Sequence, residues 1–237
     1  IDILNQLVMY DTINLWLPTD KVGSFNPSKT IQQLSNITEH IRDDGQIYAS
    51  GYLKNYKVNI SERGISLKGS LAKYFLPDNF HTLTRSDSAR AFEQMADELY
   101  LPIEKAKVNR IDFAQNFLMD YEPQAYYNYL GECQHYKRLT QPKSLYYSNG
   151  LRQKLFYNKI AEGKARGLPL PDVWNGKNVL RYEMRFTSRL PKQFNHTEVT
   201  ASNLSDEGFY MSVYDKWFAE YEAINKLHSI NFNLSDM

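Results

Sequence analysis

Three segments of the chain place ionisable side chains inside otherwise apolar, alternating sequence. They are Val108–Phe113 (VNRIDF), Lys154–Lys159 (KLFYNK) and Val179–Phe186 (VLRYEMRF). Successive side chains of a β-strand point to opposite faces of the sheet, so every second residue shares a face. In the first segment, Arg110 and Asp112 are therefore expected on the face opposite Ile111 and Phe113.

The same alternation sorts the other two segments. Arg181, Glu183 and Arg185 are expected on one face of Val179–Phe186, and Tyr157 shares a side with Lys159 in Lys154–Lys159. If the three strands are neighbours in one sheet, four groups meet over a single patch: Asp112, Glu183, Tyr157 and Lys159.

Such a patch has the parts that phosphoryl transfer requires. Two carboxylates suit Mg²⁺ or Mn²⁺, which keeps several waters and contacts substrate phosphate oxygens. A tyrosine phenol, with a reference pKa of about 10, is a poor nucleophile until a positive charge stabilises its phenolate. Lys159 is the residue that we expect to supply this charge.

Each motif by itself also has a plain structural interpretation. An Arg-x-Asp or Arg-x-Glu strand is typical of a solvated or salt-bridged face, and Tyr157 is one of 18 tyrosines. The five histidines are scattered without a paired motif, so no histidine zinc site is predicted. Cys133 is the only cysteine, which excludes an intrachain disulfide and fits a reducing cytoplasm.

Hydrophobic periodicity and turn residues predict an α+β fold, a central antiparallel or mixed sheet flanked by helices. Residues 1–205 would form the main domain, and 206–237 a helical extension packed on the same unit. The expected strands besides the three above are Asp11–Leu17, Gln46–Lys57 with a break at Gly51, Ile65–Ser70 and Leu145–Asn149. The expected helices are Thr84–Leu101, Pro123–Cys133 and Asp206–Leu227, with a polar, basic connector at His135–Lys143.

Composition agrees with a globular protein. The chain has 237 residues, of which 42% are hydrophobic and 14% aromatic, enough to bury a sizeable core. No apolar run approaches the roughly 20 residues of a membrane span, so we expect a soluble, cytoplasmic protein without a membrane partner. Lys and Arg total 28 against 27 Asp and Glu, so any nucleic-acid contact must come from a local basic face.

The order and spacing of four motifs resemble the Rep proteins of rolling-circle plasmids and the gene II type replication initiators of filamentous phages. The motifs are Arg110-Ile111-Asp112, Tyr146-Tyr147-Ser148-Asn149-Gly150, Phe156-Tyr157-Asn158-Lys159 with Glu162, and Leu180-Arg181-Tyr182-Glu183-Met184-Arg185. The resemblance spans most of the chain and implies a fold related to the Rep and relaxase nickases. It also implies an enzyme that nicks one strand at an origin and stays joined to the 5′ end.

Residue by residue, the resemblance makes Tyr157 the nucleophile and Lys159 its phosphate or phenolate partner. Asp112 and Glu183 would be metal ligands for Mg²⁺ or Mn²⁺, and Glu162 matches a trailing acid that is either a third ligand or a salt-bridge partner. The histidine pair that related endonucleases use to hold their metal has no counterpart here. Whether Asp112 and Glu183 bind the same ion is left open.

Origin DNA, single-stranded or hairpin, is the implied partner, together with a host helicase and polymerase. Family members often act as dimers, for which Trp217 and Phe218 of the terminal helix are candidate contacts. Basic and aromatic residues are the candidate DNA contacts: Lys54, Lys57, Arg63, Lys68, Arg110, Lys137, Arg138, Lys143, Tyr146, Tyr147, Arg181 and Arg185.

Three other functions use the same residues. In a non-catalytic DNA-binding module, Asp112 and Glu183 only orient Arg110 and Arg181 toward phosphate. In a nuclease that activates water at the metal, no covalent adduct forms and Tyr157 is dispensable. A mobilisation relaxase or transposase with the same tyrosine chemistry differs only in the DNA that it recognises.

Overall fold

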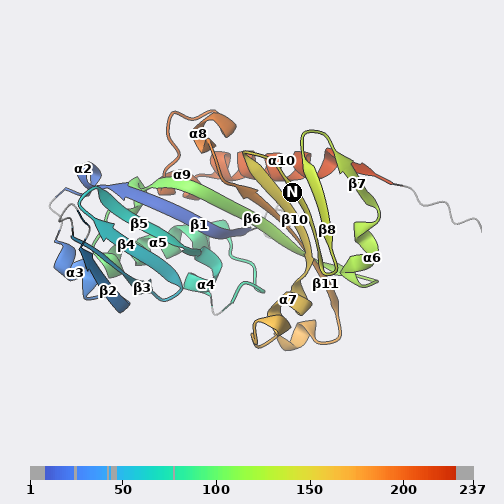
Figure 1. Ribbon diagram of the computed structural model, residues 1–237, viewed down its shortest axis with the longest axis horizontal. Coiled ribbons are helices and arrows are strands. Elements are labelled where there is room, and N and C mark those ends of the chain that lie inside the picture. Colours follow the sequence, from blue (N-terminus) through green and yellow to red (C-terminus); the bar gives the residue numbers. More distant parts are fainter. Residues whose placement is uncertain (1–8, 24–25, 42, 44–46, 77, 228–237) are drawn as a thin grey trace, which may run out of the picture.

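One antiparallel sheet runs through the whole molecule (Figure 1). The computed structural model describes residues 9–23, 26–41, 43, 47–76 and 78–227. From one edge to the other, the strands are β2 (Ser35–Ile41), β3 (Ile47–Leu53), β4 (Tyr56–Ser61), β5 (Gly64–Ser70), β1 (Met9–Pro18), β6 (Lys107–Met119), β11 (Asn178–Phe186), β10 (Arg152–Asn158), β9 (Ser144–Ser148) and β8 (Lys137–Gln141). A separate ribbon pairs β12 (Ile224–Lys226) with β7 (Leu130–Cys133).

The two faces of the sheet differ in polarity because hydrophobic and polar residues alternate along its strands. The apolar face carries residues such as Leu15, Leu67, Phe113 and Met184, all buried. The polar face carries the intervening side chains, including Asn14, Lys68, Asp112 and Arg185. Every strand pair of the sheet is antiparallel, and the helices between the strands confirm the predicted α+β class.

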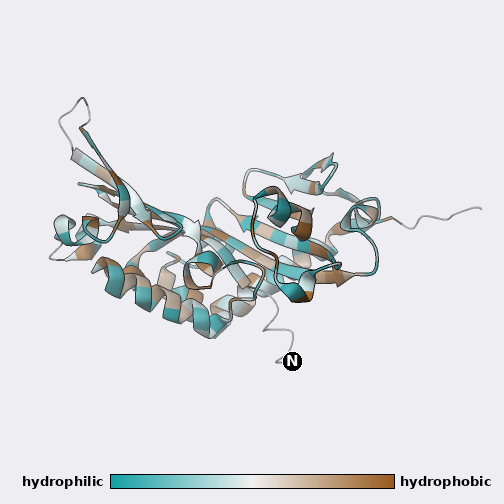
Figure 2. Ribbon diagram, turned by 90° about the horizontal axis from the view of Figure 1, so that it is seen from below, coloured by the Kyte–Doolittle hydropathy of each residue, from teal (hydrophilic) through white to brown (hydrophobic). Residues whose placement is uncertain are grey.

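The longer helices cover the apolar face. They are α5 (Arg85–Leu99), whose buried residues share one hydrophobic core with those of β1, β4 and β5, and α10 (Glu207–Glu222), whose Trp217 ring lies 4.8 Å from the Tyr182 ring of β11. Figure 2 shows α5 beneath the left half of the sheet. The shorter helices are α2 (Thr19–Val22), α3 (Pro27–Ile31), α4 (Leu71–Phe75), α6 (Pro123–Tyr127), α7 (Lys159–Ala165), α8 (Leu190–Gln193) and α9 (Ala201–Ser205), with 3-10 turns at Ile103–Lys105 and Asp172–Trp174.

Several predicted elements have different limits in the structure. The strand predicted for Gln46–Lys57 is two strands, because the chain turns at Lys54, where φ is +51°, and not at Gly51, which lies within β3 opposite Val58. Gln46 itself lies outside the described residues.

Two further predictions were wrong because strand pairing overrides the pattern along the segment itself. The connector predicted for His135–Lys143 contains the edge strand β8, whose exposed polar residues lack the usual alternation. The helix predicted for Pro123–Cys133 ends at Tyr127, since Leu130–Cys133 pairs with β12, and this pairing also removes Ile224 from the terminal helix.

Trp217 is buried against the sheet, so of the two aromatic residues predicted as a dimer contact, Phe218 is the exposed one. None of the helices in the described part of the chain combines the length and apolar character that a membrane span requires.

Candidate active site

The three motif strands are neighbours in the order β6, β11, β10, and their register brings the predicted residues together on the polar face. Asp112 is directly opposite Arg185, and Tyr157 is directly opposite Arg181. Glu183 lies between these two arginines on β11. The structure thus gathers Asp112, Glu183 and Tyr157 into one patch at the centre of the sheet.

The Tyr157 hydroxyl donates a hydrogen bond to Glu183. The distance from its oxygen to Oε2 is 3.1 Å, and the other oxygen, Oε1, accepts from Arg185 Nε at 2.7 Å. Burial raises the pKa of Tyr157 well above its usual value and the charge of Glu183 raises it further, while Arg181 opposes both. The phenol is therefore neutral and points its proton at a carboxylate that can accept it.

Asp112 is buried, with 1% of its surface exposed, and is bound by two nitrogens of Arg110. The contacts are 2.7 Å from Nε to Oδ1 and 2.6 Å from Nη2 to Oδ2, and Arg185 Nε lies 3.7 Å from Oδ2. Burial raises the pKa of Asp112 to about 7, and the charge of Glu183 adds to this although Arg110 opposes it. Burial at this carboxyl therefore outweighs the hydrogen bonds and charges of the arginines beside it.

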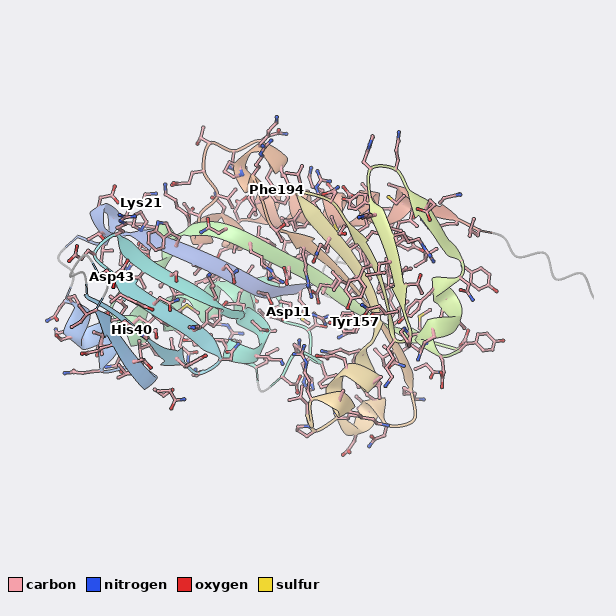
Figure 3. All side chains as sticks on the ribbon, viewed as in Figure 1. Asp11, Lys21, His40, Asp43, Tyr157 and Phe194 are labelled. Carbon is pink, nitrogen blue, oxygen red and sulfur yellow. The ribbon has the colours of Figure 1, made fainter. Side chains whose placement is uncertain are left out.

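Asp11 joins the patch although the sequence did not mark it as a site residue. The register between β1 and β6 shifts between Tyr10 and Ile13, and this bulge lets Asp11 contact groups of the polar face. Its Oδ2 lies 2.6 Å from Arg181 Nη2. Figure 3 shows Asp11 and Tyr157 in the same central region. The one available signal was an acid at the start of an otherwise apolar strand.

Lys159 begins α7 and is buried beside the patch. Its ammonium nitrogen contacts Asn79 Oδ1 at 2.8 Å and Glu162 Oε2 at 2.9 Å. Burial lowers the pKa of Lys159 to about 8, and the neighbouring charge of Arg181 lowers it further. The charge of Arg181 acts to lower the pKa of the Tyr157 phenol, while the Lys159 ammonium is engaged with Asn79 and Glu162.

The donors fit a hard divalent cation in type, because Asp112 and Glu183 offer carboxylate oxygens on one face. Two protein ligands suffice for Mg²⁺, which keeps much of its water. Each of these oxygens accepts from an arginine or from Tyr157, so a cation would have to displace some of those contacts. Among the described residues there is no cluster of three or more acids, histidines or cysteines suited to a metal.

Glu162, the trailing acid of the motif, has both oxygens in ion pairs. Oε2 contacts Lys159 and Oε1 lies 2.7 Å from Arg166 Nε. Glu162 is therefore a salt-bridge partner in this structure, and its two ion pairs do not require a metal.

The candidate DNA contacts divide into two groups. The first group is exposed or half-exposed: Lys57, Arg63, Lys68, Arg110, Lys137, Lys143, Tyr146 and Arg185. Lys57, Lys68 and Tyr146 are on the same face as Tyr157, as the pairing registers show. These groups are available to a phosphate backbone or to bases.

The second group is engaged by other groups of the protein, although Lys54 itself is exposed. Lys54 forms an ion pair with Glu98, and the Arg138 guanidinium donates to the carbonyls of residues 127 and 130. Arg181 is buried against Asp11, and Tyr147 is buried with its hydroxyl donating to the carbonyls of residues 130 and 131. Tyr147 is thus not placed to stack on a base.

The family model for the N-terminal region of the replication-associated gene II protein of phages matches residues 9–219. The matched range begins with β1 and reaches into α10, so it includes every residue of the patch. No curated protein matches the chain.

Proposed function

The chain belongs to the family of replication-associated phage proteins of the gene II type, and from this membership we propose that it initiates rolling-circle replication by nicking origin DNA. The proposed nucleophile is Tyr157. One observation carries the proposal: the Tyr157 hydroxyl donates to the Glu183 carboxylate on a face that also holds Asp112 and three arginines. A nucleophile, an acceptor for its proton and groups for a phosphate are together there.

In the proposed reaction, the Tyr157 oxygen attacks the phosphorus of one phosphodiester while Glu183 takes the phenol proton. A bond forms between the tyrosine oxygen and phosphorus, and the bond from phosphorus to the 3′ oxygen breaks. The 3′ oxygen leaves with a proton from solvent, so the products are a 5′-phosphotyrosine and a free 3′ hydroxyl. In the reverse reaction, a 3′ hydroxyl attacks the phosphotyrosine, the bond between the tyrosine oxygen and phosphorus breaks, and the DNA strand is rejoined.

The arginines suit the charge that develops on the phosphate. Arg110 and Arg185 keep 31% and 29% of their side-chain surface exposed, so a substrate can reach their guanidinium groups. Preorganised donors of this kind stabilise a charged transition state more than they stabilise the substrate. Arg181 is buried, and its charge favours the phenolate of Tyr157.

Asp112 and Glu183 are the residues that we propose to hold Mg²⁺ or Mn²⁺. Such an ion, when bound, would polarise the phosphate and lower the pKa of a nearby phenol. Asp112 must be ionised to act as a ligand.

The partners follow from the products. A host polymerase extends the free 3′ hydroxyl, a host helicase separates the strands, and the reaction takes place in the cytoplasm where the replicon is copied. Phe218 of α10, 48% exposed, is the proposed contact between two copies.

The test uses the full chain, Mn²⁺ or Mg²⁺, and supercoiled DNA with the origin of the replicon that encodes it. We expect nicked circles and a protein–DNA adduct that survives denaturant. Tyr157→Phe should abolish both and retain DNA binding. Tyr129→Phe is a matched control, because Tyr129 is 48% exposed. Nicking that persists in Tyr157→Phe without an adduct would identify a water-activating nuclease instead.

A second function, a non-catalytic DNA-binding module, is favoured by one specific observation. Both acids are bound by arginines, with Arg110 on Asp112 and Arg185 on Glu183, an arrangement that also orients guanidinium groups for phosphate. In that case the unsubstituted chain binds origin DNA but nicks none of it in either metal.

A further inference from the structure

A row of side chains crosses the N-terminal half of the polar face at right angles to the strands. The pairing registers place Tyr52 of β3, Lys57 of β4, Lys68 of β5, Asn14 of β1 and Arg110 of β6 directly opposite one another in turn. Tyr52, Lys57 and Lys68 are exposed, and Asn14 and Arg110 are half-exposed. We call these five residues the cross-strand row.

Lys57 and Lys68 face each other on adjacent strands without a carboxylate between them. Like charges that are directly opposite on adjacent strands destabilise a sheet. Within the described part of the chain neither lysine takes part in an ion pair, whereas Lys54 and Lys107 each contact a glutamate. An unbalanced cationic pair on an exposed face is complementary to a polyanion.

Trp16 lies beside this row on the same face. It is directly opposite Ser66 of β5 and Lys107 of β6, one pair further along than Asn14. Its ring lies over Gly64, because a Cβ there would be 2.8 Å from the indole atom Cζ2. Trp16 is half-exposed, and it makes no ring contact with another aromatic side chain of the described residues. A half-exposed indole of this kind is a stacking surface for an unpaired base.

The cross-strand row ends at the proposed active site. Arg110, its last member, binds Asp112 through two hydrogen bonds. Adjacent strands are about 4.8 Å apart, so the row from β3 to β6 spans roughly 19 Å. The long helix α5 is on the opposite face, as Figure 2 shows, and leaves this side of the sheet accessible.

We propose that the cross-strand row and Trp16 bind the unpaired DNA strand next to the scissile phosphate. The lysines contact successive phosphates, Trp16 stacks on a base, and Arg110 contacts the strand where the row meets the proposed active site. This inference rests on the proposed function for the position of the scissile phosphate. A single strand fits better than a duplex because only an unstacked base can meet the indole face.

The test measures binding of fluorescein-labelled dT20 by fluorescence anisotropy at several salt concentrations, in a Tyr157→Phe background so that no cleavage occurs. For single strands, the slope of log K against log salt falls by about 0.7 for each phosphate contact removed. The double variant Lys57→Gln/Lys68→Gln should therefore lower the slope by about 1.4. Lys105→Gln, an exposed lysine outside the sheet, should leave the slope unchanged.

The second arm removes the stacking surface. Trp16→Leu should weaken dT20 binding roughly tenfold without a change in salt slope, and Trp16→Phe should restore most of the affinity. If Trp16→Leu unfolds, quenching is measured instead: dT20 should quench tryptophan emission in the Tyr157→Phe protein and quench it less after Trp16→Phe.

Three outcomes would overturn the proposal. They are an unchanged salt slope in the double lysine variant, a loss of affinity in Trp16→Leu that Trp16→Phe does not restore, and an equal loss of affinity for a 20-base-pair duplex. The last outcome would indicate a duplex-binding face. Because the assay needs no cleavage, a chain that never nicks DNA can still pass it. A chain that nicks but fails it retains the proposed function without this strand-binding surface.

Discussion

The ion pair between Asp11 and Arg181 joins two halves of the sheet, and its removal has a calculable cost. The pair connects β1 to β11 across 170 residues of sequence, with 7% and 0% of the two side chains exposed. Asp11→Asn removes the negative charge and turns one acceptor into a donor that faces Arg181 or Ser70. Removing one partner of a buried ion pair typically costs about 3–5 kcal/mol.

The expected cost lies at the lower end of that range because Arg181 keeps other partners. Its Nη1 donates to Asn116 Oδ1 at 3.0 Å, and its Nε lies 3.5 Å from Glu183 Oε2. We expect a loss of about 3 kcal/mol in the free energy of unfolding at pH 7. For a domain of this size, that corresponds to a fall in Tm of roughly 6–12 °C.

Urea unfolding followed by circular dichroism measures this change, with Asp97→Asn on the exposed side of α5 as the control. Burial acts to raise the pKa of Asp11, but Arg181 and Ser70 hold it below its ordinary value. The stability that Asp11 contributes is therefore present above its unfolded pKa of about 3.9 and is lost as the pH falls through the lower folded value. The difference between the unsubstituted chain and Asp11→Asn should shrink accordingly.

A loss below about 1 kcal/mol at pH 7 would refute this reasoning. So would a difference between the two proteins that stays constant from pH 7 down to acid unfolding, because it would then arise from packing and not from charge.

Three further predictions concern the site and the sheet. Mn²⁺ affinity, measured by calorimetry, should rise with pH up to about 7 and then level off, because the pKa of Asp112 is raised to about 7 and its proton competes with the metal; affinity that ignores pH over this range would argue against Asp112 as a ligand. Because the pKa of Lys159 is lowered to about 8, the unfolded chain binds more protons than the folded chain between pH 8 and 10.5. The free energy of unfolding should therefore rise by about 3 kcal/mol over that window relative to Lys159→Met. Parallel pH profiles of the free energy of unfolding for the two proteins would contradict this prediction. Gly64→Ala should lower the free energy of unfolding by about 1–3 kcal/mol, since φ is +150° and a Cβ would lie 2.5 Å from the Leu17 carbonyl oxygen. Gly150→Ala is the control, because a Cβ at Gly150 meets open space and should change the free energy of unfolding little. Similar effects of the two substitutions in urea unfolding would show that a small backbone shift relieves the close approach at Gly64.

Much of the site followed from strand alternation, which is a local property. Because side chains of a strand repeat every two residues, VNRIDF and VLRYEMRF already separate Asp112, Arg181 and Glu183 from their apolar neighbours. The apolar stripe of α5 was also predictable from its own segment, because the 3.6-residue periodicity of its apolar residues can be seen without knowledge of the rest of the chain.

Other features depended on pairing between strands, which the residue pattern of a single strand does not reveal. The exposed edge strand β8 has no apolar alternation and exists because β9 pairs with it. Tyr146 and Tyr147 are adjacent in sequence, yet only Tyr146 points to the polar face, and the pairing of β9 with β10 decides which of the two is available.

The sequence by itself determined which side chains share a face of each strand, and so which acids, arginines and tyrosine could meet if the strands were neighbours. Only the tertiary structure decided that β6, β11 and β10 are neighbours, that a bulge in β1 brings Asp11 to Arg181, and that this buried arginine lies directly opposite Tyr157. The physical reason is that alternation is set by bond geometry within a strand, whereas register and strand order are set by hydrogen bonds and packing between residues far apart in the chain.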